Sequence, residues 1–146
     1  MLKNKLQIIE CSKAHYTELA AIWEGAVRAT HSFLDEEAIC AIKAELTTLY
    51  FPAVELFATV ESGHTVGFIG LNDDSIEMLF VDCEHFGCGY GSTLIDFAKR
   101  KGACRVDVNE QNPQALEFYL AHGFHITGRD ECDEAGRPYP ILHLSL

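Results

Sequence analysis

The sequence predicts an α/β fold with a mixed, mostly antiparallel sheet of about seven strands and helices on both faces. Three observations favour this class. Short apolar runs separated by turn residues predict hairpins in the first half and at the end of the chain. Stretches with apolar residues three and four positions apart predict amphipathic helices. A strand–helix–strand succession in the middle of the chain predicts one parallel crossover, so the sheet must be mixed.

The expected strands are runs rich in β-branched and aromatic residues. In chain order they cover 6–11, 55–60, 65–71, 75–82, 104–108, 124–131 and 139–146. Ser62-Gly63-His64 makes a short turn between the second and third strands, and 133–138 joins the last two into a closing hairpin.

The first two helices are expected before the second strand. One begins after a cap at Ser12, and the other opens at Asp35 and ends before Pro52. The apolar positions of the first are Leu19, Ile22, Trp23, Ala26 and Val27. Those of the second are Ile39, Ile42, Leu46 and Leu49.

Two further helices flank the strand at 104–108. The helix from Tyr90 to Lys101 ends at Gly102, where a glycine commonly stops a helix. The next begins at Asn112, a good cap followed by proline, and ends at Gly123.

Length and composition set limits on function. With 146 residues, the chain is expected to form a single domain, 1–146. Its formal charge of −11, from 11 basic and 22 acidic residues, disfavours non-specific nucleic-acid binding. No apolar run approaches ~20 residues and the first residues do not resemble a signal peptide, so we expect no membrane span and a cytoplasmic location. The six cysteines and seven histidines do not pair at metal-ligand spacing, so we expect reduced thiols and no metal site.

The most informative segment is glycine-rich: Phe86-Gly87-Cys88-Gly89-Tyr90-Gly91, between an apolar strand and a helix. Glycines let the backbone approach a ligand closely. The first turn of the following helix, which includes Ser92, offers unpaired N–H groups and the positive end of the helix dipole. This arrangement predicts a phosphate or pyrophosphate site.

A second block lies about thirty residues on. It consists of Asn112, Ala115, Phe118, Tyr119, Gly123 and Phe124. Together, the two segments and the order of the elements resemble the GNAT superfamily of acetyl-CoA-dependent N-acetyltransferases over nearly the whole chain. The family's phosphate signature, Gln/Arg-x-x-Gly-x-Gly/Ala, falls on residues 86–91, and its later block, Asn-x-x-Ala-x-x-Phe-Tyr-x-x-x-Gly-Phe, fits without a gap.

One residue departs from the family pattern. Phe86 stands where the family usually has Gln or Arg, so one polar contact to the pyrophosphate is lost. A charge-assisted hydrogen bond contributes about 1.5–3 kcal/mol, which predicts roughly ten- to a hundredfold weaker cofactor binding. The backbone N–H groups of 87–92 remain, and a contact from the Phe86 ring could offset part of the loss.

The resemblance implies that acetyl-CoA lies where the strands at 75–82 and 104–108 part. It implies cofactor contacts from Leu79, Phe80, Val81, Phe86, Gly87, Cys88, Gly89, Tyr90, Gly91, Ser92, Asn112 and Tyr119. A primary amine then attacks directly, giving a tetrahedral oxyanion that a backbone N–H can stabilise. Tyr119 matches the family's general acid for the departing thiolate, and a phenol with a pKa near 10 suits a thiol with a pKa near 8.5.

The general base is less defined by the sequence. The two candidates are Glu77, on the strand before the glycine loop, and His31, in the joint between the first two helices. Each has a structural alternative: Glu77 on the solvent side of its strand, His31 in a packing role. Weaker site candidates are Asn109, Glu110, Tyr139 and His143.

The expected acceptor is a small cationic amine, a protein lysine or a protein N-terminus, and the chain is expected to be a monomer or homodimer. Two rival functions remain. A catalytically silent acyl-CoA sensor on the same fold would also explain Phe86. A dinucleotide-binding module is suggested by Gly87 and Gly89 with Asp107 twenty residues on, although the third glycine falls one position early.

Overall fold

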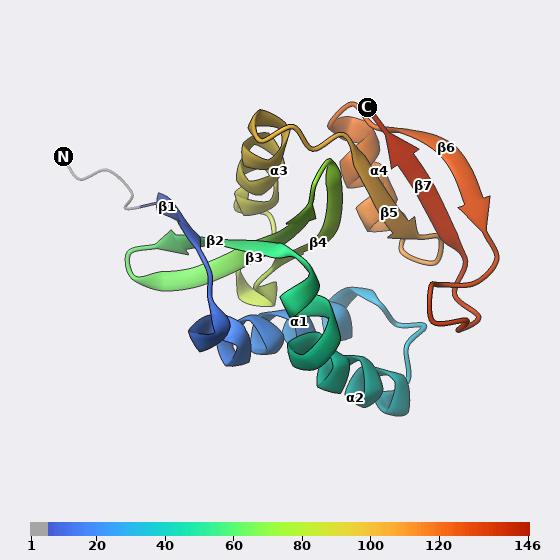
Figure 1. Cartoon of the computed structure of the whole chain (residues 1–146), viewed down its shortest axis with the longest axis horizontal. Helices are drawn as coiled ribbons and strands as arrows, with labels where there is room; N and C mark the ends of the chain where they lie inside the picture. Colours follow the sequence, from blue (N-terminus) through green and yellow to red (C-terminus); the bar gives the residue numbers. More distant parts are fainter. Residues whose placement is uncertain (1–5) are drawn as a thin grey trace.

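The computed structural model describes residues 6–146 and contains a seven-stranded sheet (Figure 1). The strands are β1 (Leu6–Glu10), β2 (Glu55–Glu61), β3 (His64–Asn72), β4 (Ser75–Val81), β5 (Arg105–Asn109), β6 (His125–Asp130) and β7 (Ile141–Ser145). Their order is β1-β2-β3-β4-β5-β7-β6, and every neighbouring pair is antiparallel except β4 and β5. The predicted mixed, mostly antiparallel sheet is confirmed. A sheet with one parallel pair is not the doubly wound sheet that a dinucleotide-binding module requires.

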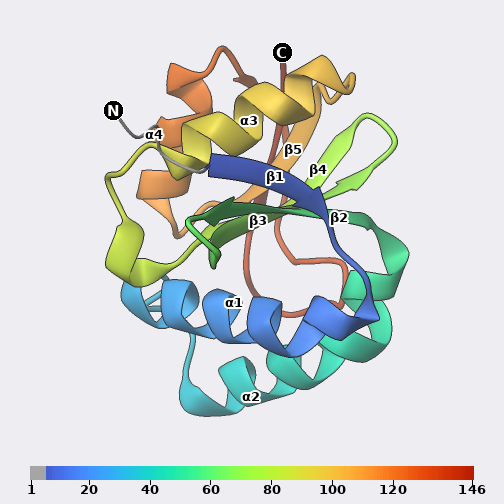
Figure 2. The ribbon, with the colours of Figure 1, turned by 90° about the vertical axis from the view of Figure 1, so that its left-hand side faces the viewer.

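The helices cover both faces of the sheet, as predicted (Figure 2). They are α1 (Tyr16–Thr30), α2 (Glu36–Glu45), α3 (Tyr90–Arg100) and α4 (Pro113–Ala121). Helices α1 and α2 lie on one face, and α3 and α4 lie on the other. Short helical turns cover 13–15, 46–50, 51–53 and 83–85.

Two details of the first helices differ from the predictions. A 3₁₀ turn follows Ser12, and the α-helix itself begins only at Tyr16. Leu49 was predicted to share the buried face of the second helix, and this is wrong: its side chain is 58% exposed. The α-helix changes at Leu46 into a wider π-helical turn, which carries Leu49 away from the face that buries Ile39.

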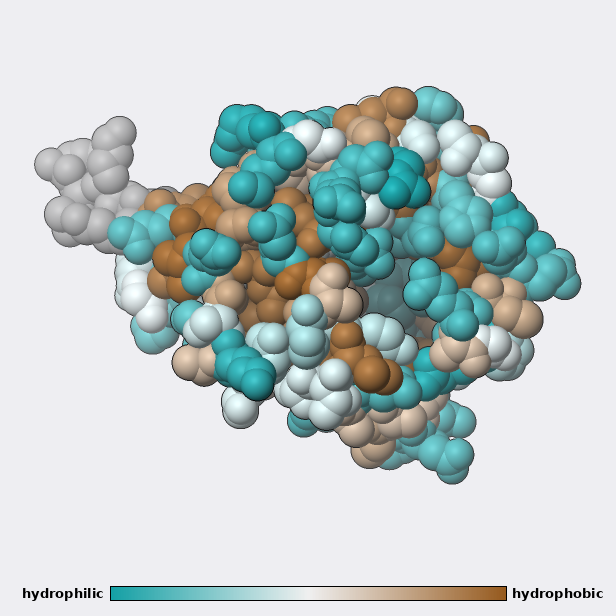
Figure 3. All heavy atoms as spheres, in the orientation of Figure 1, coloured by the Kyte–Doolittle hydropathy of each residue, from teal (hydrophilic) through white to brown (hydrophobic). Residues whose placement is uncertain are grey.

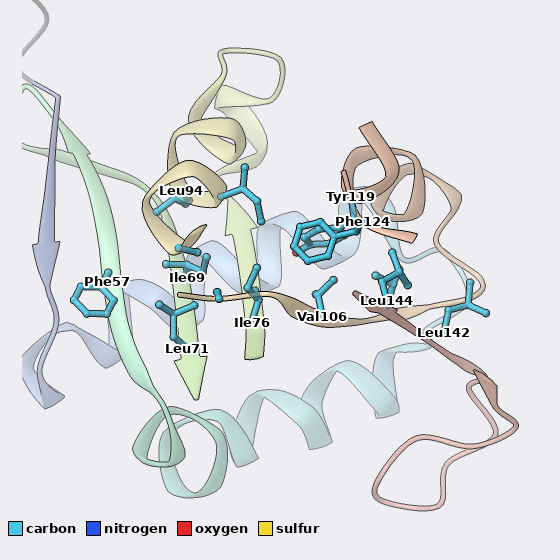
Figure 4. Packing of buried hydrophobic residues seen from close by; sticks show 14 residues of the cluster. Phe57, Ile69, Leu71, Ile76, Leu94, Val106, Tyr119, Phe124, Leu142 and Leu144 are labelled. Atoms are coloured by element: carbon cyan, nitrogen blue, oxygen red, sulfur yellow. The ribbon is translucent and has the colours of Figure 1, made fainter. Parts of the chain in front are cut away.

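Each face of the sheet has its own hydrophobic core. On the α3/α4 face, the rings of Tyr119 and Phe124 pack together above the β5 side chain Val106 (Figure 4). On the α1/α2 face, Phe51 and Phe68 meet edge to face with ring centroids 5.8 Å apart. The two cores hold the helices against the sheet and fix where α1 and α4 meet its central strands.

Among residues 6–146, no helix is long and apolar enough to cross a membrane. In the same part of the chain, no three or more His, Cys, Asp or Glu side chains are grouped so that they could hold a metal ion.

Candidate active site

The central feature of the site is a gap between the two parallel strands. β4 and β5 pair only at Ser75 with Arg105 and Ile76 with Val106, after which they diverge. A cavity of about 660 Å³ occupies the gap and is lined by α1, β4, the glycine-rich loop, β5 and α4. The space-filling view, in the orientation of Figure 1, shows a hollow near the centre of the molecule (Figure 3). The sheet therefore opens at its middle, where the resemblance places the cofactor.

A β-bulge shapes the β4 side of this gap. Gly70 pairs with Met78 and Leu71 pairs with Ile76, so Glu77 is an extra residue without a partner on β3. The bulge reverses the alternation of side chains: Ile76 packs in the α3/α4 core, whereas Met78, two residues later, packs on the α1/α2 side.

Beyond the bulge, alternate backbone groups of β4 point into the gap. The Asp82 N–H donates to the Val66 carbonyl (2.9 Å), so these opposite residues form a hydrogen-bonded pair. Such pairs alternate along an antiparallel ladder, so Phe80 also bonds to β3, whereas Leu79 and Val81 direct their N–H and C=O groups away from it. Both residues line the cavity and have no partner strand on β5. Backbone donors and acceptors are thus available to an extended ligand.

The glycine-rich loop closes one end of the cavity. Gly87 and Gly89 have φ values of +81° and +87°, a conformation that side-chain-bearing residues rarely adopt. Gly91 is needed for space, since a Cβ there would lie 3.3 Å from the ring of Phe118. α3 starts at Tyr90, so its first N–H groups face the loop.

The other predicted cofactor residues in this loop differ in how they meet the cavity. Phe86 is 44% exposed and contributes to the cavity wall. Cys88 is exposed and is not among the lining residues, so its side chain points elsewhere. Ser92 lines the cavity and its hydroxyl lies 3.0 Å from His122 Nε2, which joins α3 to the end of α4. The Tyr90 hydroxyl donates to Glu61.

Tyr119 lies in the opposite wall, on α4. Its side chain is 6% exposed, and burial raises the pKa of its phenol well above the ordinary value near 10. Phe118 and Phe124 meet its ring edge to face at 5.1 and 5.6 Å. Within residues 6–146 its hydroxyl makes no hydrogen bond, although Tyr119 lines the cavity. The site therefore holds a protonated phenol with a free O–H.

His31 and Asn112 meet at another part of the cavity wall. Asn112, the cap of α4, accepts the Ala115 N–H at its Oδ1 (3.2 Å), which confirms the capping role predicted for it. Its Nδ2 lies 3.3 Å from His31 Nε2. Burial lowers the pKa of His31 to about 4, and Phe33 covers the imidazole with a ring-centroid distance of 5.3 Å.

Two carboxylates also line the cavity, one on each strand beside the point of divergence: Glu77 on β4 and Asp107 on β5. Glu77 accepts the Ser75 hydroxyl (2.6 Å), and Asp107 bonds His143 Nδ1 (2.7 Å). The sequence suggested Asp107 only as the acidic residue of a dinucleotide fingerprint, not as part of an acetyl-CoA site, and the available signal was its place on a strand bordering the gap. Nearby, the Oδ1 atom of Asn109, which also lines the cavity, is buried without a hydrogen-bond partner among residues 6–146.

The remaining weak candidates lie outside the cavity lining. Glu110 forms an exposed ion pair with Arg129 (2.7 Å). The imidazole of His143 lies between Asp107 and Asp130, and the hydrogen bonds to these two carboxylates raise its pKa. Tyr139 packs on Phe33 at 5.7 Å, behind His31.

Comparison with known proteins identifies this arrangement. Residues 18–140 match the family model of the acetyltransferase (GNAT) domain. The chain belongs to the GNAT acetyltransferase family. It is therefore an enzyme of the acyltransferase class, and the resemblance read from the glycine loop and the later block is confirmed.

Two curated GNAT relatives cover most of the chain. Peptidyl-lysine N-acetyltransferase YjaB of Escherichia coli K12 is 40% identical over 130 residues, which is 88% of this chain and 88% of YjaB. Its Salmonella typhimurium counterpart is 40% identical over 132 residues, covering 87% and 88% of the two chains.

Solved structures agree in fold. The solution structure of apo YjaB from E. coli superposes with a TM-score of 0.88 at 35% identity, covering 99% of this chain and 97% of that one. The PaiA N-acetyltransferase of Thermoplasma acidophilum, solved with coenzyme A, gives a TM-score of 0.75 at 18% identity, covering 97% and 99% of the two chains. At that identity the likeness shows the fold alone.

Proposed function

We propose that this protein transfers an acetyl group from acetyl-CoA to the ε-amine of a lysine in a protein or peptide. The observation that carries the proposal is the gap between β4 and β5. Its β4 edge presents backbone groups that no other strand among residues 6–146 pairs, the glycine loop lies at one end, and the phenol of Tyr119 lies opposite. The names of the two YjaB relatives support lysine as the acceptor.

The residues present fit acetyl-CoA. Positive φ at Gly87 and Gly89, with open space around both, leaves room for a pyrophosphate against the N–H groups at the start of α3. The gap-facing groups of Leu79 and Val81 can bond the amides of the pantetheine arm as a neighbouring strand would. Phe86 supplies an apolar contact where the family usually supplies a polar one.

The proposed reaction needs one bond to form and one to break. The lysine nitrogen bonds the thioester carbon, and a gap-facing N–H of β4 stabilises the resulting oxyanion. When the C–S bond breaks, the thiolate takes the phenolic proton of Tyr119. Burial raises the pKa of the phenol, so Tyr119 is a weaker acid than an ordinary phenol. The same dry surroundings also disfavour the thiolate and raise the pKa of the leaving thiol, which keeps the transfer of the proton feasible. Water then returns a proton to Tyr119.

The amine must lose a proton as it attacks. Of the two predicted bases, we propose Glu77, whose exposed side chain lines the cavity at the bulge. Among residues 6–146, the Ser75 hydroxyl is the one hydrogen-bond donor to its carboxylate. Asp107 adds a second negative charge across the point of divergence. Two carboxylates attract an ammonium group, which supports lysine or another cationic amine over a neutral acceptor.

Parallel assays, each with a different amine, test which acceptor the protein uses. Purified protein and acetyl-CoA are mixed with an N-terminally blocked lysine peptide, with a lysine-free peptide whose N-terminus is free, or with spermidine, and thiol release is followed. We expect release with the lysine peptide, and mass spectrometry should place the acetyl group on the ε-amine. Release only with spermidine would replace lysine by a small amine. Binding of acetyl-CoA without release for any amine would favour the silent sensor.

A further inference from the structure

A chain of hydrogen bonds joins the end of α1 to the start of α4. Thr30 and His31 end α1, and Asn112 caps α4, 81 residues later. Thr30 Oγ1 lies 2.7 Å from His31 Nδ1, and His31 Nε2 lies 3.3 Å from Asn112 Nδ2. All three residues line the cavity. The contact therefore connects two helices that lie on opposite faces of the sheet.

The partners fix the tautomer of the imidazole. The Thr30 hydroxyl has a single proton and donates it to the Ala26 carbonyl at 2.8 Å, so it can only accept from His31 Nδ1. His31 Nδ1 therefore carries the ring proton and Nε2 does not. The Asn112 amide is oriented independently, because its Oδ1 accepts the Ala115 N–H. Its Nδ2–H₂ faces His31 and donates to the bare Nε2.

This contact bears on Tyr119. Asn112 and Tyr119 are seven residues apart, two helical turns, and both line the cavity. Holding the first turn of α4 against His31 therefore fixes where the phenol lies along the cavity. The main chain of His31 is fixed by the bond from its N–H to Val27 O (2.7 Å), and its ring packs on Phe33 with the ring centroids 5.3 Å apart.

We propose that His31 is a positioning residue for the transfer reaction: its neutral imidazole accepts a hydrogen bond from Asn112 and thereby sets the position of Tyr119, rather than taking the proton of the amine. This role rests on the proposed function. It differs from the base predicted from the sequence, because the Nε2 lone pair that a base would use is engaged by Asn112. The low pKa of the buried imidazole agrees with this assignment.

Substitutions at His31 separate the two roles. His31→Gln keeps an acceptor at the position of Nε2, but an amide is not protonated near neutral pH. His31→Ala removes the acceptor. We expect kcat within about threefold of wild type for His31→Gln and about tenfold lower for His31→Ala, with little change in KM for the lysine peptide. Equal large losses of kcat in both variants would overturn the proposal. His125→Ala, on exposed β6, controls for loss of a histidine.

Asn112→Ser tests the other partner. A serine hydroxyl still caps α4 by accepting the Ala115 N–H, but the shorter side chain does not reach His31, whereas an aspartate could accept a hydrogen bond from the other tautomer of the imidazole. We expect kcat to fall about as far as in His31→Ala. The affinity for acetyl-CoA, measured by calorimetry, reports separately any contact of Asn112 with the cofactor. An unchanged kcat would contradict the proposal.

A measurement without turnover tests the same contact. In ¹⁵N-labelled, ligand-free protein, the imidazole nitrogen shifts show which ring nitrogen carries the proton. We expect a protonated Nδ1 and a bare Nε2 for His31, and a protonated Nε2 would overturn the assignment. If the wild-type protein transfers no acetyl group, the proposed function fails, and this measurement alone decides whether the hydrogen bond is as assigned.

Discussion

The two walls of the cavity offer different kinds of chemical group. The first wall, β4 with the glycine loop at 86–91, offers mainly backbone: gap-facing groups at Leu79 and Val81, and the N–H groups that begin α3. The second wall, β5 with α4, offers side chains: Asp107, Asn112 and Tyr119.

This difference predicts how each wall tolerates substitution. A backbone wall depends on the path of the chain and on small residues, so side chains that keep the path can vary. Phe86 in place of Gln or Arg is an example, since the donors beside it are main-chain groups. A side-chain wall depends on individual functional groups, so replacing one atom can remove the chemistry.

The largest effect is expected on the side-chain wall. Tyr119→Phe keeps the packing of the ring but removes the proton donor for the thiolate. We expect kcat to fall by about 10²- to 10⁴-fold, the range for general acid catalysis. The Kd for acetyl-CoA, measured by calorimetry, should stay within about threefold of wild type. An unchanged kcat would remove Tyr119 from the mechanism.

The next effect concerns the link between the walls. Burial lowers the pKa of His31 to about 4 from an ordinary 6.5, so protonation favours the unfolded chain. The contribution of neutral His31 to the free energy of unfolding is fully present above pH 6.5 and is lost as the pH drops from 6.5 to 4. Between pH 7 and pH 4 the free energy of unfolding of wild type should fall on the order of 3 kcal/mol more than that of His31→Gln. Urea denaturation of both proteins at both pH values measures this, and equal losses would mean that His31 is not buried as a neutral ring.

A smaller effect is expected on the backbone wall. Val81→Pro removes an N–H that points into the gap and leaves the β3 ladder intact, whereas Val81→Ala changes only the side chain. Calorimetry should show about tenfold weaker acetyl-CoA binding for proline and less than about threefold for alanine. Similar losses in both variants would mean that the side chain, not the backbone, makes the contact.

The smallest effect is expected at His143, which is hydrogen-bonded to Asp107. Hydrogen bonds to Asp107 and Asp130 raise the pKa of His143, so its contribution to stability is present below pH 6.5 and is lost as the pH rises through the raised value. The ion pairs are exposed, so His143→Gln should cost less than about 1 kcal/mol at pH 6, and still less at pH 9. A greater loss in the free energy of unfolding at pH 9 than at pH 6 would contradict the raised pKa of His143.

Most of the fold could be predicted because each element has its own local signal. Alternation marks the strands, and caps such as Asn112 and stops such as Gly102 mark helix ends. The bulge at Glu77 and the π-helical turn at 46–50 have no such signal, because packing between elements decides them.

The site was predictable to a similar degree. The glycine loop and Tyr119 each belong to a recognisable block, and the structure brings them to one cavity. The contact between His31 and Asn112 spans 81 residues, and the sequence contains no pattern that pairs them. Asp107 was assigned only to the rival dinucleotide fingerprint and not to the acetyl-CoA site, because a single acidic residue on a strand usually faces solvent.

Amide hydrogen exchange along β4 tests the central claim most directly. NMR would follow the exchange of Leu79, Phe80 and Val81 with and without acetyl-CoA, with NADH as the control ligand. The gap-facing amides of Leu79 and Val81 should become protected with acetyl-CoA alone, whereas Phe80, already bonded to β3, should change little. Unchanged exchange at Leu79 and Val81 in the presence of bound acetyl-CoA would contradict the account, because the cofactor would then lie outside the gap between β4 and β5.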